Sequence, residues 1–508
     1  GYHTLTINRS GGGSKSLPFT LNGEELGTPY QAVLPVGEYH ISVPTPFDVG
    51  TGVLAFASWS DGVKTSSRSF TLENRLILVC TYNLISGYAS CPSLFIWNGT
   101  DYSYVTEISN AGWLGYIDHI NADGTVVFGG GTPWDYIKLD KNSLAVTDGY
   151  FDMALFQQWD ELFYVDSAHM LVVDHPIGTD VYTTMSNYLN KGLNDQVYTV
   201  NKNNLITPLS ATNEKGENVL AQISQQDGVF ISGSNGLLSP SWNNPTLNQL
   251  TLNLGNLSSA QQIKLVINGM VDWGDPGPYY TWIDQFKAAA AKGLVADGTE
   301  IYPEQYIEVL DANGNWVRVS QERQIPMPAD YRARSYTVNL TGVFPEGIST
   351  YKVRMTNFWN VSFDYIAADI SNEQAINVQK ITPSGNLTQI WESLSNSTGA
   401  FTRYGDVTPI LQEADDMYVI GRQGDQLDLK FSTANLTAVP AGMERDYFLI
   451  VSCWFKDPPG GWGYMFDFTV DPLPFIGMTG FPYTSSESYP YDAAHRAYLA
   501  KYNTRVFT

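Results

Sequence analysis

The sequence predicts an all-β protein made of several consecutive β-sandwich domains, immunoglobulin-like or jelly-roll-like, with few short helices. Apolar and polar residues alternate with period two in segments such as Tyr2–Ile7 and Tyr39–Val43, a pattern typical of half-buried strands. Helix signals are scarce, and the best is Trp282–Lys292, which contains four consecutive alanines and ends before Gly293. Turn-forming pairs recur at the spacing of short strands: Asn22-Gly23, Asp61-Gly62, Asn98-Gly99, Asp123-Gly124 and Asn313-Gly314.

The composition excludes several classes of protein. Only 16% of the 508 residues are charged, and 28 Lys and Arg against 51 Asp and Glu give a net charge of −23. An anion of this size is repelled by a phosphate backbone, so a nucleic-acid partner is not expected. Apolar residues make up 43%, too many for a disordered chain, yet no run of 18 apolar residues predicts a membrane span. The surface must therefore consist mostly of uncharged polar residues.

Several features predict an extracellular location. The chain begins at Gly1 rather than Met, as expected of a secreted chain whose signal peptide has been removed. Cys80 and Cys91 are close enough in sequence to form a disulfide in an oxidising compartment, which leaves Cys453 as a buried thiol. Eight Asn-x-Ser/Thr sequons are candidate glycosylation sites: Asn8, Asn98, Asn256, Asn339, Asn360, Asn386, Asn396 and Asn435.

Four domains are predicted, at residues 1–84, 85–240, 241–372 and 373–508. The first is a small sandwich, and its segment Trp59-Ser60-Asp61-Gly62 followed by strands at 68–72 and 76–82 resembles the end of PEGA-type surface domains. That resemblance implies a stalk or adaptor rather than a catalyst. The predicted N-terminal strand Tyr2–Ile7 is also expected to add to the sheet edge of a neighbouring subunit.

The second and third domains are both strand-rich. In residues 85–240, a hairpin after Cys91-Pro92 precedes the strand end Val173-Asp174-His175-Pro176, which resembles an uncharacterised module of secreted multidomain proteins. In residues 241–372, the segments 354–357 and 363–366 resemble the closing strands of galactose-binding-type jelly rolls.

Residues 373–508 form a predicted C-terminal β domain with distinctive short sequence motifs, such as Thr402-Arg403-Tyr404-Gly405-Asp406 and Pro440-Ala441-Gly442-Met443. Together with residues 85–372, this region resembles the non-propeller part of secreted multidomain proteins that carry FG-GAP, ASPIC/UnbV or tetratricopeptide segments. The resemblance implies a secreted β-protein and no particular activity.

Three sets of residues invite a metal-binding interpretation. Asp406, Asp415, Asp416 and Asp425, with Asp428 nearby, are interpreted as turn and capping carboxylates, as Ca²⁺ ligands or as a catalytic pair of a glycoside hydrolase. Asp311, Asn313 and Asn315 have the spacing of a calcium loop, but Trp316 stands where such a loop requires Gly, which favours a hairpin turn. His169 and His175, beside Asp166 and Asp174, are favoured as structural residues. No cofactor other than Ca²⁺ is suggested.

A Gly- and Pro-rich loop carries exposed aromatic candidates: Trp273, Tyr279, Tyr280 and Trp282. Such rings either seal an interface between domains or subunits or stack against sugar rings, and the interface is favoured.

These observations predict a secreted or cell-surface structural glycoprotein, a building block of a surface layer, sheath or filament, with self-association as its main interaction and glycans as possible partners. No nucleophile elbow, phosphate-binding loop or dinucleotide fingerprint occurs, so an enzyme is not favoured. The alternative is a carbohydrate-binding protein or glycan-active hydrolase. The composition resembles outer-surface proteins of acid-loving archaea, and a surface with few charges predicts tolerance of acid.

Overall fold

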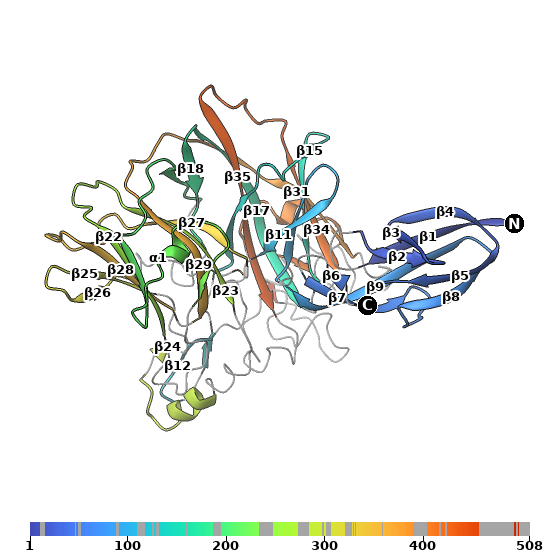
Figure 1. The fold of residues 1–508 in the computed structure, drawn as a ribbon, viewed down its shortest axis with the longest axis horizontal. Helices are drawn as coiled ribbons and strands as arrows, with labels where there is room; N and C mark the ends of the chain where they lie inside the picture. The colour runs from blue at the N-terminus through green and yellow to red at the C-terminus, as the bar shows by residue number, and fades with distance from the viewer. Residues whose placement is uncertain are drawn as a thin grey trace.

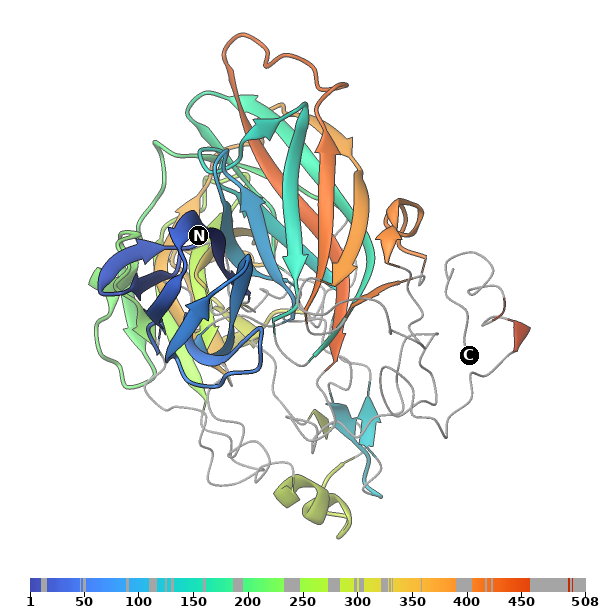
Figure 2. The same cartoon turned by 90° about the vertical axis from the view of Figure 1, so that its right-hand side faces the viewer.

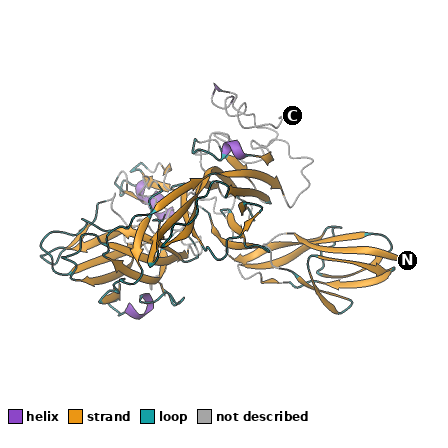
Figure 3. Cartoon of the chain, turned by 90° about the horizontal axis from the view of Figure 1, so that it is seen from above, coloured by secondary structure: helices purple, strands orange, loops and turns teal. Residues whose placement is uncertain are grey.

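The computed structural model describes most of the chain, and Figure 1 shows its arrangement. The described residues are 1–10, 16–45, 47–48, 52–87, 91–108, 117–123, 126–128, 132–158, 161–185, 195–232, 247–272, 284–296, 299–300, 306–320, 328, 330, 332–357, 359–389, 404–415, 418–421, 424–456, 492–493 and 496. Strands dominate throughout these residues (Figure 3), and the predicted all-β class with several β-sandwiches is confirmed.

The first sandwich lies at the N-terminal end and projects from the rest of the molecule (Figures 1 and 3). Sheet A has the order β4-β1-β9-β7-β6, with bounds Tyr30–Pro35, Tyr2–Ser10, Leu76–Gly87, Gly52–Trp59 and Phe47–Asp48. Sheet B has the order β3-β2-β5-β8, with bounds Glu24–Gly27, Pro18–Leu21, Gly37–Ser42 and Ser67–Leu72. Side chains from both sheets form its core, including Leu5, Ile7, Phe19, Ile41, Trp59, Leu72 and Leu78.

Strand β1 occupies an interior position in sheet A. It pairs with β4 on one side, antiparallel, and with β9 on the other, parallel. Its backbone groups are therefore already used within its own sheet. The expectation that Tyr2–Ile7 adds to a neighbour's sheet edge is wrong, because β4 and not β1 forms that edge.

The middle sandwich contains the longest strands, which stand side by side in Figure 2. Sheet C has the order β11-β10-β16-β34-β31-β32, with bounds Tyr102–Glu107, Ser93–Trp97, Tyr150–Phe156, Asp425–Ser432, Pro383–Gln389 and Gly405–Asp406, and β15 (Val146–Thr147) pairs with β16. Sheet D has the order β14-β35-β17-β30, with bounds Trp134–Leu139, Met443–Lys456, Leu162–Pro176 and Asn377–Ile381, and β33 (Val419–Gly421) pairs with β17.

This sandwich is assembled from two distant parts of the sequence. β16 pairs with β34, and β17 pairs with β35 over most of its length. Strands from the predicted domains 85–240 and 373–508 thus lie in the same sheets, as two adjacent blocks in sheet C and in alternation in sheet D, and they share one core. The predicted boundaries do not separate these two regions, because local patterns of alternation report strands but not which distant strand each one pairs with.

A third sandwich is inserted between the two parts of the middle one. The chain enters it through the hairpin β18 (Thr179–Tyr182) and β19 (Tyr198–Asn201) and leaves it before β30. Its five-stranded sheet has the order β20-β22-β28-β25-β26, with bounds Ser210–Asn213, Asn248–Gly255, Tyr351–Asn357, Tyr306–Leu310 and Trp316–Arg318. Its four-stranded sheet has the order β21-β29-β23-β27, with bounds Ile231–Ser232, Asn360–Asp369, Lys264–Asp272 and Arg334–Asn339.

Few helical segments occur among the described residues. They include α1 (Leu220–Ile223), the 3₁₀ turn η3 (Thr408–Ile410) and a helical stretch at 284–290, and residues 493 and 496 are also helical. The stretch at 284–290 lies within the predicted helix 282–292, buries Phe286 and Ala290, and is followed by Gly293 at a φ of +68°, where glycine is favoured. A small sheet joins β12 (Ile117–Ile120), β13 (Val126–Phe128) and β24 (Thr299–Glu300).

Sheet D is covered on both faces, and this arrangement determines where charged groups meet. One face packs on sheet C, and Met170 and Val172 of β17 belong to that core. The other face packs on the hairpin β18–β19, where Leu171 and Val173 contact the cluster that contains Val181. Polar residues on this second face are therefore enclosed between the middle sandwich and the start of the inserted one.

Candidate functional site

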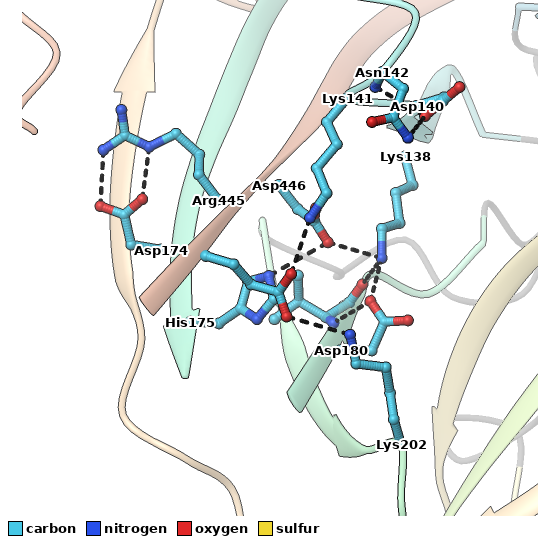
Figure 4. Close-up of polar contacts among 12 residues, drawn as sticks. Lys138, Asp140, Lys141, Asn142, Asp174, His175, Asp180, Lys202, Arg445 and Asp446 are labelled. Carbon is cyan, nitrogen blue, oxygen red and sulfur yellow. Dashed lines mark hydrogen bonds and ion pairs between the residues drawn. The ribbon is translucent and has the colours of Figure 1, made fainter. Parts of the chain in front are cut away.

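A network of ion pairs lies where β17 and β35 meet the hairpin β18–β19 (Figure 4). Lys138 of β14 reaches Asp180 of β18 at 2.5 Å and Asp446 of β35 at 3.1 Å. Lys141 reaches Asp446 at 3.1 Å, and the ring of His175 lies 3.4 Å from the same carboxylate. The network therefore links sheet D to the root of the inserted sandwich.

Asp446 is the centre of this network. Its side chain is only 8% exposed, and burial alone would raise its pKa. Contact with His175 and ion pairs with Lys138 and Lys141 outweigh the burial and hold the pKa of Asp446 well below its usual range. The carboxylate thus stays ionised inside the protein because Lys138 and Lys141 compensate its charge and His175 contacts it.

Glu444 and Arg445, the neighbours of Asp446 on β35, form further ion pairs. Glu444 accepts from Lys141 at 3.1 Å and from Lys202 at 3.2 Å, and these contacts outweigh burial and lower the pKa of Glu444. Arg445 points to the opposite face and binds Asp174 of β17 with two nitrogens, at 2.6 and 2.8 Å. This bidentate geometry is the stronger form of an Arg–carboxylate pair.

A second ionic cluster joins the middle and inserted sandwiches at another point. Arg334, the first residue of β27, binds Asp135 of β14 at 2.6 Å and Asp330 at 2.5 Å. Its guanidinium also donates to the Thr106 hydroxyl at 2.9 Å and to the carbonyl oxygen of Glu107 at 2.5 Å. Burial alone would lower the pKa of Arg334, but Asp135 and Asp330 outweigh it and raise that pKa, so the guanidinium stays charged.

The predicted acidic group is dispersed rather than gathered at one point. Asp425 is buried and accepts hydrogen bonds from Gln389 at 3.0 Å and from Tyr404 at 2.9 Å. Asp406 accepts from the Thr408 N–H at the start of η3, and Asp415 is exposed, with its N–H donating to Asp166. Asp416 lies outside the described residues. Among the residues that are described, no cluster of three or more His, Cys, Asp or Glu could hold a metal ion, and Ca²⁺ binding stays a prediction.

The two histidines of β17 contact different carboxylates. His169 contacts Asp195 at 2.9 Å, and His175 contacts Asp446. The side chains share one face of the strand, but six residues at about 3.3 Å each place them roughly 20 Å apart. They do not meet at one metal ion.

In the motif with the spacing of a calcium loop, Asp311 accepts hydrogen bonds from the N–H groups of Asn313 and Asn315 within the hairpin turn between β25 and β26.

No disulfide joins Cys80, Cys91 or Cys453, which lie in separate cores, so the predicted Cys80–Cys91 disulfide is not formed in this structure. Cys80 belongs to the core of the first sandwich, Cys91 to that of the inserted sandwich and Cys453 to that of the middle one. Burial raises the pKa of the Cys80 thiol to about 12. Closeness in sequence did not predict pairing because the chain passes from one sandwich to the next between Cys80 and Cys91.

The sequons differ in exposure. Asn8 and Asn360 are partly buried, and Asn396 lies outside the described residues. The exposed sequons are Asn98, Asn256, Asn339, Asn386 and Asn435.

The aromatic candidates Trp273, Tyr279, Tyr280 and Trp282 also lie outside the described residues, so their interface or sugar-stacking role stays a prediction.

One part of a sheet face of the first sandwich, formed by β4, β1 and the start of β9, is exposed and carries no charged residue. Because partners in register share a face, Thr4 of β1, Val33 of β4 and Ile77 of β9 belong to the outer face of sheet A. Tyr2, Val33 and Ile77 are 69%, 66% and 48% exposed. We call this the uncharged face, and its residues are Tyr2, Thr4, Thr6, Asn8, Gln31, Val33, Pro35, Ile77 and Val79.

The edge strand β4 borders the uncharged face, and no pairing of its outer edge is found among the described residues. Charged residues usually protect such edges from pairing with other chains. The other edges of this sandwich follow that rule, with Glu24 and Glu25 on β3, Arg68 on β8 and Asp48 on the two-residue β6. β4, whose sequence is Tyr-Gln-Ala-Val-Leu-Pro, has no such residue.

A small pocket with a cavity volume of about 20 Å³ lies in the inserted sandwich. Its lining has one carboxylate, Glu214, and one aromatic ring, Phe363. A glycoside hydrolase needs two carboxyl groups across its cleft, so this pocket does not fit that chemistry.

In the part of the chain that is described, no helix is long and apolar enough to cross a membrane.

Comparisons with known proteins leave the family open. No family model matches this chain, and no curated protein sequence matches it. Among solved structures, the major pilin subunit of Bacillus cereus aligns over 75% of this chain and 95% of its own, with 9% identity and a TM-score of 0.11. Infectious bursal disease virus, Gx strain, aligns over 72% of each chain, with 9% identity and a TM-score of 0.08. At these TM-scores neither likeness bears on fold or function.

Proposed function

We propose that this protein is a structural subunit of an extracellular assembly, and that copies meet through the uncharged face and the β4 edge. The observation that carries the proposal is the combination of exposed apolar side chains and an unguarded edge strand on a sandwich that projects from the molecule (Figure 1). Such a combination is typical of surfaces that pair with another chain.

Charge supports a second copy of this chain as the partner. A chain with a net charge of −23 repels its own copies wherever charged surfaces approach. Copies can come together at lowest electrostatic cost where a surface carries no charge. The two ionic clusters further support a structural role, because they fix the inserted sandwich to the middle one.

Val33→Lys tests this proposal. A lysine there places a charge on the uncharged face and at the open edge, as natural proteins do to prevent edge pairing. We expect the unmodified full chain to sediment as oligomers or polymers and Val33→Lys to shift it toward monomers, with self-association weakened at least tenfold.

Val146→Lys is the matched control, since Val146 is also an exposed valine, at 53%, but lies on β15 of the middle sandwich. It should self-associate as the unmodified chain does. Equal behaviour of both variants and the unmodified chain would contradict the proposed interface.

A further inference from the structure

A buried lysine lies at the root of the inserted sandwich, apart from the two clusters above. Lys264 is the first residue of β23 and is 1% exposed. Its ammonium nitrogen, Nζ, contacts Asp369 Oδ2 at 3.2 Å and Glu373 Oε1 at 2.8 Å, and it donates to the carbonyl oxygen of Thr199. One amine thus faces two carboxyl groups inside the protein.

Backbone pairing holds the amine and one carboxyl group together. Lys264 and Asp369 are direct partners in the antiparallel pair β23–β29. The Asp369 side chain is 0% exposed, and Ser371 donates its N–H to Oδ1 at 3.1 Å and its hydroxyl to Oδ2 at 2.8 Å. The two side chains therefore have little freedom to separate, and a high effective concentration favours reaction between them.

Glu373 is placed to exchange protons with this pair. Its Oε1 contacts Lys264 Nζ, while its Oε2 accepts the N–H and the hydroxyl of Thr199, both at 2.7 Å. The Glu373 side chain is 37% exposed, so it can pass a proton between the buried pair and water.

We propose that Lys264 and Asp369 condense to form an isopeptide bond between β23 and β29. Transfer of one proton from the ammonium of Lys264 to the carboxylate of Asp369 gives an uncharged amine and an uncharged acid. The nitrogen lone pair attacks Cγ of Asp369, a C–N bond forms, and the carboxyl C–OH bond breaks. The departing oxygen takes one proton from the amine by way of Glu373 and leaves as water, so no oxidant or energy source is required.

The bond would close the inserted sandwich at its base. β23 and β29 are central strands of the four-stranded sheet, and Asp369 lies just before the chain returns to β30. A covalent link there would resist pulling on the two ends of the insert. It is independent of the proposed assembly, because it lies within one chain and uses none of the residues of the uncharged face.

Mass spectrometry of the full chain tests the proposal. We expect the denatured protein to be lighter than its sequence by one water molecule. After trypsin digestion, the peptides that contain Lys264 and Asp369 should appear as one branched species, with no cleavage after Lys264. Fragment spectra should place the link on Asp369, and Lys264→Arg, which keeps the charge but cannot form this amide, should restore the full sequence mass.

Two internal controls sharpen the result. Asp-Gly pairs such as Asp61-Gly62 can also lose water by forming a succinimide, but this reaction joins no peptides. Lys138, which faces Asp180 and Asp446 and is 24% exposed, should be found unlinked. A full-mass chain with normal cleavage after Lys264, or a link to Glu373 instead of Asp369, would overturn the proposal.

Discussion

Replacing Asp446 by alanine is expected to lower the free energy of unfolding of the middle sandwich by about 3–5 kcal/mol at pH 7. The reason is that Lys138 and Lys141 would lose the carboxylate that compensates their charge inside the network, and His175 would lose its contact with that carboxylate. Urea unfolding of the full chain, followed by tryptophan fluorescence, measures the loss.

Asp61→Ala is the control, because Asp61 forms an ion pair with Arg68 but is 41% exposed. Exposed pairs contribute about 0–1 kcal/mol, so this variant should unfold almost as the unmodified chain does. Equal, small losses in both variants would show that the network around Asp446 does not stabilise the fold.

The effect of Asp446 depends on pH with a defined sign. Its folded-state pKa lies below the unfolded value of about 3.9, so its stabilisation is fully present above that value and is lost as pH falls through the folded pKa. Asp180 and Glu444 also have lowered pKa values: burial would raise each one, and the lysine contacts outweigh it. The difference between Asp446→Ala and the unmodified chain should therefore shrink only below pH ~4, which fits the proposed tolerance of moderate acid.

Replacing Arg334 by methionine is expected to separate the unfolding of the inserted sandwich from that of the middle one. Arg334 compensates Asp135 on the middle sandwich and Asp330 beside its own strand, and both carboxylates are at most 8% exposed. Leaving them unpaired should cost about 3–5 kcal/mol. Calorimetry should show one main transition of these two sandwiches in the unmodified chain and two in the variant.

Arg354→Met provides the comparison for this result. Arg354 binds Glu308 at 2.5 Å, but β28 and β25 both belong to the inserted sandwich. Loss of that pair should lower the stability of the insert without separating the transitions. If Arg354→Met separates them as Arg334→Met does, the cluster around Arg334 is not the link between the two sandwiches.

Local patterns in the sequence predicted the strands better than their partners. Alternation identified Tyr2–Ile7 and Tyr39–Val43, which became β1 and β5, and four alanines before Gly293 identified the helical stretch at 284–290. The pairing of β16 with β34 was not predicted, because it joins residues that are more than 250 positions apart. Alternation within a strand carries no information about such a partner.

The charged clusters were missed for a related reason. His175 and Asp174 were noticed as a strand end, but only the β17–β35 register places Arg445 opposite Asp174 and Asp446 diagonally across from His175. Lys264 was not singled out, since a single lysine at the start of an apolar segment is typical of a strand boundary. A charged residue flanked by apolar residues in a sparsely charged chain would have been the available signal.

The central claim is that copies of this chain assemble through the first sandwich. Electron microscopy of the purified full chain, with particle mass determined at neutral and acidic pH, tests it most directly. The account predicts ordered polymers or oligomers in which copies touch through β4 and the uncharged face. Single particles of 56.3 kDa at every pH and concentration would contradict it.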